Sequence, residues 1–209
     1  MNRAKIKKEA KELVKENLWD VVKPFLILLG CALVLGLLSV NTITPDGSYN
    51  PAANLLTMAC EFALYPISFG VLVYILKFVR KEPYGVKDIF NQYKKFWPIF
   101  ALNFLVGLLV FAWSLLLIVP GIIAAIKYTM SMLIMADGEE DALKCIKKSK
   151  AMMNGYKWDY FVFQLSFIGW ILLGVITAGI AYIFICPYIN VATVLYYEEL
   201  KKVNPPTIE

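Results

Sequence analysis

Long apolar runs separated by short polar segments dominate the chain. Apolar residues fill roughly positions 25–40, 55–76, 98–135 and 160–197, and the segments between them collect most of the lysines and acidic residues. A helix needs about 20 apolar residues to cross about 30 Å of hydrocarbon, and the last two runs are nearly twice that long. The pattern therefore predicts a helical membrane protein whose two longest runs each fold into two spans.

Turn-forming residues divide these two runs. Pro120 lacks an amide proton and Gly121 accepts turn geometries that other residues avoid, so the pair predicts a tight turn between antiparallel spans. A proline kink in one long tilted helix is the alternative. The last run divides near Thr177, Ala178 and Gly179. We expect an all-α membrane protein of six transmembrane helices in three hairpins, forming one domain over 1–209, with spans at about 24–41, 55–79, 98–119, 121–136, 160–176 and 180–197.

A charged segment with helical periodicity precedes each hairpin, at about 3–20, 85–96 and 139–157. A helix with an apolar stripe, a lysine-rich face and a terminal tryptophan is typical of the membrane interface and is attracted to anionic headgroups. The alternative is that these segments pack on the spans without selecting lipid. The expected apolar stripes are Ile6, Ala10, Leu13, Val14 and Val21; Val86, Ile89, Phe90, Tyr93 and Trp97; and Ala142, Leu143, Ile146 and Met153.

Composition and charge sharpen this picture. The 209 residues are 59% hydrophobic and 18% charged, too apolar for an ordinary soluble domain. Charged, helix-patterned residues precede the first apolar run and no small-residue cleavage site follows it, so we expect the first span to be retained. All but one of the 21 basic residues lie before 24, at 77–95, at 144–157 or at 201–202. Because short basic loops stay in the cytoplasm, we expect a multi-pass cell-membrane protein with both termini cytoplasmic.

A set of dispersed residues resembles a known family pattern. The set is Trp113, Leu116, Pro120, Gly121, Tyr128, Asp137, Ala142, Ser149, Met153, Gly155, Lys157, Ser166, Phe167, Gly169, Trp170, Thr177, Gly179, Pro187, Tyr188 and Tyr197. It resembles the bacterial integral-membrane family catalogued as domain of unknown function 975, most specifically from Trp113 to Tyr188. Gly138 with Glu139, and Gln92 with Tyr93, depart from that pattern, where a proline and a Gly-Phe pair are usual.

The resemblance implies a multi-span bacterial membrane protein, distantly similar to the membrane portion of some glycerophosphodiester phosphodiesterases, and it implies no reaction. Its shared residues Pro120, Gly121, Gly169, Trp170, Pro187 and Tyr188 are best explained as structural motifs. Glycines such as Gly169 and Gly174 let helices approach closely, and Pro187 kinks the last span.

Two ionisable residues fall within the expected spans, Glu61 and Lys127. Each lies six residues past the outer end of its span, roughly 9 Å deep at the helical rise. A charge at that depth is costly, so equal depth and opposite charge suggest an ion pair that could line a transport pathway. The alternatives are that Lys127 snorkels outward and that Glu61 is protonated.

The sequence gives little support for catalysis or for metal binding. The chain has no histidine and no recognisable nucleophile or phosphate-binding motif. The acidic cluster Asp137, Glu139, Glu140 and Asp141 could bind a divalent cation, but its position favours the start of a helix. The four cysteines are spaced singly, which favours neither disulfides nor zinc, and we expect no cofactor.

We therefore expect a non-catalytic membrane protein that organises anionic membrane lipids or partner membrane proteins through a basic cytoplasmic face. Nucleic-acid binding is not expected, because no recognition motif accompanies the lysines. A transporter or channel component that uses Glu61 and Lys127 is the alternative, and a lipid-modifying enzyme is a third hypothesis. A homo-oligomer is left open. The candidate lipid-interface residues are Trp19, Trp97, Lys94, Lys95, Lys157 and Trp158.

Overall fold

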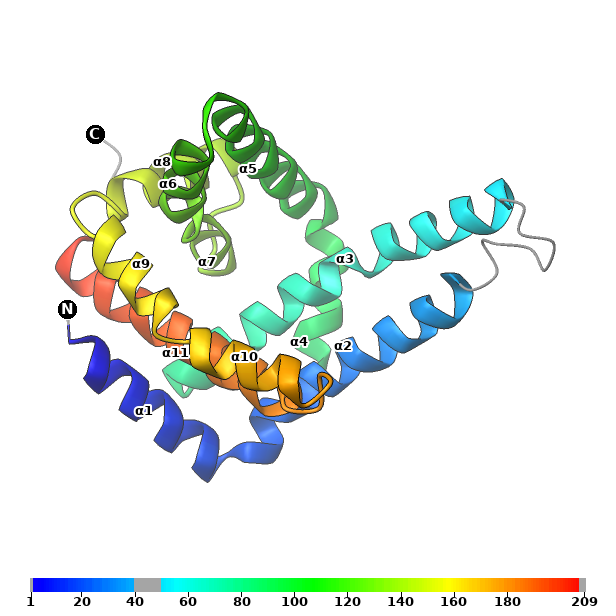
Figure 1. Ribbon diagram of the computed structural model, residues 1–209, viewed down its shortest axis with the longest axis horizontal. Coiled ribbons are helices and arrows are strands. Elements are labelled where there is room, and N and C mark those ends of the chain that lie inside the picture. The colour runs from blue at the N-terminus through cyan, green and yellow to red at the C-terminus, as the bar shows by residue number, and fades with distance from the viewer. Residues whose placement is uncertain (1, 40–49, 207–209) are drawn as a thin grey trace.

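The computed structural model describes residues 2–39 and 50–206, which form helices and turns without a strand. The polar segment between the first two apolar runs, 41–54, was expected to be a loop; its residues 41–49 lie outside the described residues, and residues 51–54 form the start of α3. The helices are α1 (Arg3–Glu16), α2 (Leu18–Ser39), α3 (Pro51–Arg80), α4 (Val86–Phe90), the 3-10 helix η2 (Asn91–Lys95), α5 (Phe96–Leu116), α6 (Ile118–Tyr128), α7 (Ser131–Ala136), α8 (Ala142–Met152), α9 (Lys157–Leu165), α10 (Ile168–Ile176) and α11 (Tyr182–Val203) (Figure 1).

Five helical stretches are long and apolar enough to cross a membrane. They are Leu18–Ser39, Pro51–Arg80, Val86–Leu116, Ile118–Ala136 and Lys157–Ile176. The expectation of an all-α, multi-span membrane protein is confirmed at this level. The sixth expected span, 180–197, corresponds to α11, which is not among the five stretches found in the described residues. α11 packs against α1, α2, α3 and α10.

Both long apolar runs are broken, as predicted, but the first break is displaced. α5 ends at Leu116, and Leu117 is extended, with φ −163° and ψ 154°. Pro120 and Gly121 instead lie in the first turn of α6, where a proline costs no hydrogen bond because helix-initial amides have no partner. The expected turn at Pro120–Gly121 was therefore wrong in position.

Close packing explains Gly121, and backbone geometry explains the second break. A Cβ added at Gly121 would lie 3.0 Å from the Ser114 Cα, so this glycine lets α6 approach α5. Ala178 and Gly179, with φ 50° and 91°, form the turn between α10 and α11 where the sequence predicted it.

The charged segments are helical, and the apolar faces of the first and third are covered by the protein. In α1, Ile6, Ala10 and Val14 are buried, and the helix packs along α11. In α8 the buried face includes Ile146 and Met152, and this helix packs on α5, α6 and α7. Both helices therefore pack on the spans through their apolar faces.

The protein covers the expected apolar stripes to different extents. Val86, Phe90 and Tyr93 are 45%, 46% and 43% exposed, whereas Ile89 among them is buried. Leu143 is also exposed, whereas Cys145 and Ser149 beside it are buried. The residues just after residue 90 form a 3-10 helix, whose three-residue turn changes which side chains share a face.

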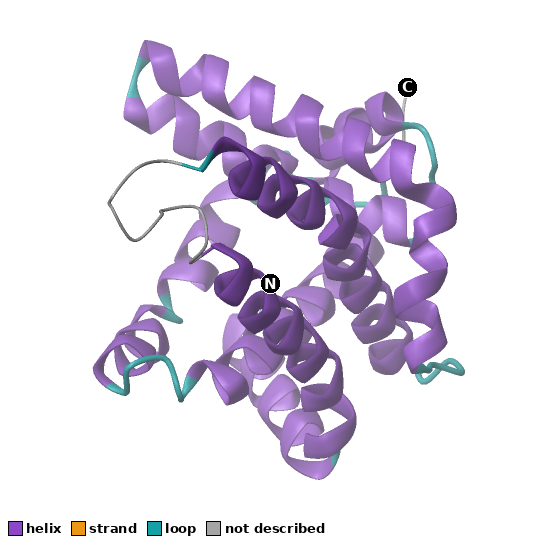
Figure 2. Cartoon of the chain, turned by 90° about the vertical axis from the view of Figure 1, so that its right-hand side faces the viewer, coloured by secondary structure: helices purple, strands orange, loops and turns teal. Residues whose placement is uncertain are grey.

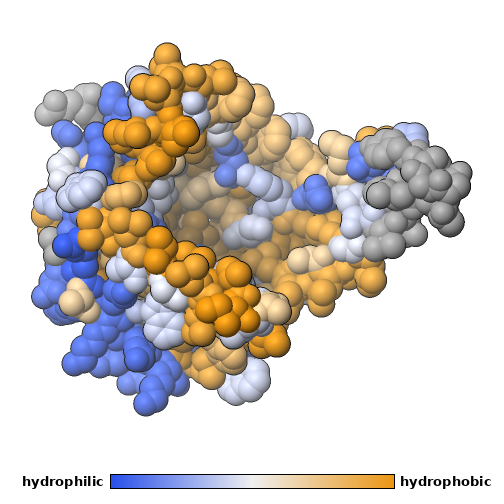
Figure 3. Space-filling model, viewed as in Figure 1, coloured by the Kyte–Doolittle hydropathy of each residue, from blue (hydrophilic) through white to orange (hydrophobic). Residues whose placement is uncertain are grey.

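Hydrophilic and hydrophobic side chains are segregated on the surface. Hydrophilic side chains gather on the side where α1 begins and α11 ends, and hydrophobic side chains cover much of the rest of this face (Figure 3). The outer half of α3 and its neighbour α2 extend away from that hydrophilic side as a two-helix arm (Figures 1 and 2). Helix ends remote in sequence meet on the hydrophilic side, through Arg3 with Asp159 and Arg80 with Asp137 and Glu198.

Candidate functional site

An apolar groove lies between α1, the start of α2 and the α10–α11 hairpin. Its cavity volume is about 280 Å³, and it is lined by Lys11, Val14, Lys15, Leu18, Trp170, Phe184, Ile185 and Tyr188. Lys11 and Lys15 are one helical turn apart, so both lie on the groove side of α1. Within the described part of the chain, neither lysine is in an ion pair.

Two residues of the expected structural motif build the groove wall. The rings of Trp170 and Tyr188 meet edge to face, with centroids 5.9 Å apart, and Tyr188 also contacts the ring of Phe167. Pro187, the neighbour of Tyr188, is buried inside α11. The family-like residues of this region thus shape one wall against which α1 packs.

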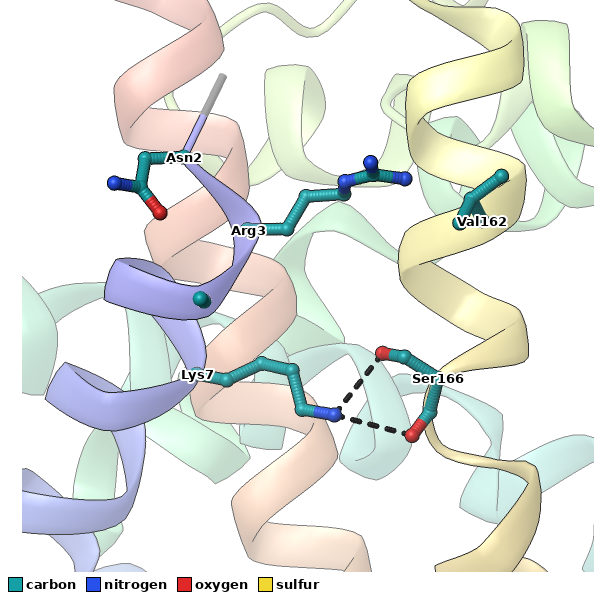
Figure 4. Close-up of a pocket in the computed structure, with 6 residues that line it drawn as sticks. Asn2, Arg3, Lys7, Val162 and Ser166 are labelled. Carbon is teal, nitrogen blue, oxygen red and sulfur yellow. Dashed lines mark hydrogen bonds between the residues drawn. The ribbon is translucent and has the colours of Figure 1, made fainter.

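Polar contacts fix α1 in place. The Lys7 ammonium donates hydrogen bonds to the Ser166 hydroxyl and carbonyl, both at 3.1 Å, and lies 4.7 Å from the centre of the Phe167 ring (Figure 4). Arg3 forms an ion pair with Asp159 at 3.4 Å, and the Tyr188 hydroxyl donates to the Lys7 carbonyl. Burial lowers the pKa of the Lys7 ammonium. These contacts hold the groove-facing lysines of α1 in register with α11.

The same contacts border a wide surface hollow. Its volume is about 1010 Å³, and it is lined by Asn2, Arg3, Ala4, Lys7, Val162 and Ser166 (Figure 4). The polar groups that face it are already engaged, Lys7 with Ser166 and Arg3 with Asp159. Ser166, one of the family-like residues, therefore anchors α1 here.

The three predicted interface tryptophans are strongly exposed. Trp19, Trp97 and Trp158 are 68%, 71% and 72% accessible, far more than large aromatic side chains normally are in a folded protein. Among the predicted lysines, Lys94 is exposed and Lys157 is half-buried, whereas Lys95 forms an ion pair with Glu140 at 2.7 Å. Exposed tryptophans beside lysines are typical of the membrane–water interface.

A charge network that the sequence did not reveal joins three helix ends. Arg80 of α3 binds Asp137 and Glu198, with 2.7 Å from a guanidinium nitrogen to each carboxylate. The Tyr197 hydroxyl donates to Asp137 at 2.9 Å, and Lys201 pairs with the same carboxylate. Burial alone would raise the pKa of Asp137, but these donors outweigh it and hold that pKa below its usual value.

The acidic cluster is divided among separate partners. Asp141 caps α8 by accepting hydrogen bonds from the Leu143 and Lys144 amides, which agrees with the helix-start interpretation. Glu139 pairs with Lys148 at 2.6 Å. In the described ranges 2–39 and 50–206, no group of three or more metal-binding side chains gathers.

Glu61 and Lys127 lie in different surroundings. Glu61 faces a cavity of about 340 Å³ between α2 and α3, whereas the Lys127 ammonium lies 5.4 Å from the centre of the Tyr128 ring. The Lys127 carbonyl accepts a hydrogen bond from Ser149 of α8. The ion pairs of the described residues do not join Glu61 to Lys127. α3 carries Glu61 toward α2, whereas α6, which carries Lys127, packs on α5, α8 and α9.

The glycines of the expected motif differ in role. A Cβ at Gly169 would meet no atom within 4 Å, so the expected close helix approach at Gly169 is wrong. Gly174 fits the expectation, because a Cβ there would lie 2.7 Å from a ring carbon of Tyr182.

Cys145 should react slowly with thiol reagents in the folded protein. Its side chain is buried in α8, and burial together with the nearby Glu139 raises the pKa of the thiol to about 12. The thiolate is the reactive form, so little is present near neutral pH. Alkylation followed by peptide mass spectrometry should show Cys145 unmodified in the native protein and modified after denaturation. Complete native alkylation at pH 8 would contradict this placement.

The comparisons with known proteins agree with the carboxy-terminal part of this picture. No curated protein and no solved structure matches the chain. A family model matches residues 109–204, which include all of α6 to α11, Asp137 and the Trp170–Tyr188 wall of the groove. The family's description assigns no activity. Residues 109–204, a little under half of the chain, are therefore similar to the family described as protein of unknown function (DUF975).

Proposed function

We propose that the protein is a non-catalytic membrane protein that binds anionic phospholipid at its cytoplasmic face, in the groove beside α1. The observation that carries this proposal is the groove itself. Lys11 and Lys15 stand at the edge of a cavity whose other walls are apolar, including Trp170, Phe184 and Ile185. An acyl chain fits such walls, and an anionic headgroup fits the two ammonium groups.

Charge balance favours a headgroup as the missing partner. An ammonium beside an apolar hairpin is costly unless it is paired or reaches water. Most acidic side chains of the neighbouring network are already bound, as with Asp159 to Arg3 and Asp137 to Arg80. A phosphate held between Lys11 and Lys15 supplies the counter-charge and directs its acyl chain along α10 and α11.

The exposed tryptophans support an interfacial position for this face. Trp19 follows Leu18, which lines the groove, and Trp97 and Trp158 begin the second and third hairpins. Lys94 and Lys157 lie close to these two tryptophans in sequence. Together with the lysines of α1, they form a basic face that attracts an anionic leaflet.

We also propose a topology of six spans with both termini in the cytoplasm. Arg3 binds Asp159, and Arg80 binds both Asp137 and Glu198. Contacts of this kind require that the joined helix ends lie on one side of the membrane. The chain between them must then cross an even number of times, which favours hairpins. In this arrangement α11 crosses as an inner helix, shielded by α1, α2, α3 and α10.

Exchanging the groove lysines should weaken retention of anionic lipid. Each lysine near an anionic surface contributes about 1 kcal/mol, so Lys11→Gln with Lys15→Gln should lower affinity by about thirtyfold. Native mass spectrometry of protein released from mixed phosphatidylglycerol and phosphatidylcholine micelles measures this retention. The wild type should keep phosphatidylglycerol preferentially.

The matched control removes the same charge from the same helix. Lys5 and Lys8 of α1 do not line the groove, and Lys8 is already near Glu12. The variant Lys5→Gln with Lys8→Gln should retain phosphatidylglycerol almost as the wild type does. If both variants lost phosphatidylglycerol equally, retention would depend on the net charge of α1 and not on the groove, which would contradict the proposal. Unchanged retention in both variants would also overturn it.

A further inference from the structure

A second polar site lies inside the helical bundle, away from α1. Its cavity has a volume of about 260 Å³ and is lined by Tyr65, Ser68, Phe69, Leu72, Asn103, Met132 and Asn190. Four helices contribute, α3, α5, α7 and α11, and the hollow between them is seen near the centre of Figure 3. Two asparagines and a serine in such a place need a reason, because polar groups in a membrane interior are costly.

This cavity adjoins the one that holds Glu61. Tyr65 and Ser68 line both, and the second cavity adds Glu61 and apolar residues of α2 such as Leu28 and Leu35. The two adjoining cavities, with Glu61 in one and Asn103 and Asn190 in the other, are together called the α3 path. Neither cavity is lined by a lysine or an arginine.

The asparagine amides are anchored through their nitrogen atoms. The Asn103 amide nitrogen donates to the Ile99 carbonyl at 3.1 Å and to the Met132 sulfur at 3.5 Å, and the Asn190 amide nitrogen donates to the Cys186 carbonyl at 2.9 Å. An amide oxygen only accepts, so each asparagine also brings an acceptor to the lining. With the Glu61 carboxylate and the Ser68 hydroxyl, the lining is rich in oxygen acceptors.

Prolines lie inside two of the helices that line the same path. Pro66 lies inside α3 between Glu61 and Ser68, and it cannot donate to the Phe62 carbonyl. Pro187 lies inside α11 three residues before Asn190, and the break between α6 and α7 precedes Met132. Backbone carbonyls that lose their helical donor line solute-binding sites in some membrane proteins.

We propose that this path binds a small organic ammonium ion, with its charge near Glu61 and the asparagine oxygens. A carboxylate and neutral acceptors without a basic side chain select a cation. The aromatic rings of Tyr65 and Phe69 add faces that attract an ammonium group. The volume and the leucine side chains favour an organic ion over a bare metal ion, which needs six or more oxygens at short distance.

This inference is independent of the lipid groove, and its test uses no anionic lipid. The full chain is placed in phosphatidylcholine nanodiscs, and binding of radiolabelled n-butylammonium is measured by equilibrium dialysis, with empty nanodiscs as the blank. Butyrate and n-butanol, of similar size, test the role of charge. Saturable binding of butylammonium alone is the expected result.

Substitutions test whether butylammonium binds within the α3 path. Glu61→Gln should weaken butylammonium binding by about tenfold or more, because it removes the charge partner. Asn103→Leu should also weaken it. Glu82→Gln removes an equal charge from an exposed position outside both cavities and should bind as the wild type does. Thermal unfolding of each variant shows that the fold is kept.

Several outcomes would overturn the proposal. These are absence of saturable binding in the wild type, equal binding of butanol, or unchanged binding in Glu61→Gln. Displacement of butylammonium by an equal concentration of potassium would also contradict the choice of an organic ion. A folded Glu61→Gln variant with lost binding, beside an unaffected Glu82→Gln, would support it.

Discussion

Replacing Asp137 with asparagine should destabilise the protein by about 3 kcal/mol, because breaking a buried ion pair leaves its partners uncompensated. Asp137 holds Arg80, Lys201 and the Tyr197 hydroxyl, and the side chains of Asp137 and Arg80 are only 17% and 22% exposed. Its carboxylate joins the end of α3 to α11. Unfolding of the detergent-solubilised protein, followed by circular dichroism, measures the loss.

The matched control is Glu140→Gln. Glu140 pairs with Lys95, but its side chain is 62% exposed, so its loss should change stability by less than about 1 kcal/mol. If both variants lose the same small amount, the Arg80–Asp137–Glu198 network does not hold the helix ends together.

The Asp137 network should also make stability depend on acid. The pKa of Asp137 is held below its usual value in the folded protein, so this carboxylate stabilises the fold above the unfolded pKa of about 4. That stabilisation is lost as the pH falls from there through the folded pKa. Acid titration of the unfolding temperature should show a decline in the wild type that is smaller in Asp137→Asn. Equal declines in both proteins would assign the acid sensitivity to other carboxylates.

Replacing Gly70 with alanine should destabilise the protein by about 3 kcal/mol, the upper end for overpacking in a tight interior. A Cβ at Gly70 would lie 2.6 Å from the Ile89 Cα and 2.8 Å from its carbonyl carbon, so the backbone of α4 must move. Thermal unfolding measures the loss, and hydrogen exchange at 86–90 should become faster because α4 no longer fits against α3.

Gly107 supplies the control for this substitution. It also lies within a long helix, but an added Cβ would meet no atom within 4 Å. Gly107→Ala should therefore leave stability unchanged or raise it slightly, since alanine favours helices over glycine. Similar losses at Gly70 and Gly107 would mean that helix contact is not the cause.

The sequence predicted the helices well because apolar length and periodicity are local properties. Turn positions were less certain, since a proline suits both a turn and the first turn of a helix, and Pro120 lies in the latter. The split near Ala178 and Gly179 was correct because the apolar run is too long for one span, and a glycine accepts the positive φ that the turn requires.

Contacts between distant residues could not be predicted in the same way. Arg80 and Glu198 are 118 residues apart, and no spacing rule joins them. Equal depth suggested that Glu61 and Lys127 meet, but depth does not specify which helix faces which neighbour. In the sequence, only the lysines of α1 and the residues Trp170 and Tyr188 indicated the groove. Its formation depends on how α1 packs on α11.

The site of lipid binding is the central claim, and photo-crosslinking locates it directly. Phosphatidylglycerol with a diazirine in its acyl chain is bound to the full-length protein, irradiated, and mapped by peptide mass spectrometry. Adducts should concentrate at Leu18, Phe184 and Ile185 of the groove and should fall in Lys11→Gln with Lys15→Gln. Adducts spread equally over exposed apolar residues of α5, such as Phe104 and Phe111, and unchanged in that variant, would contradict the account.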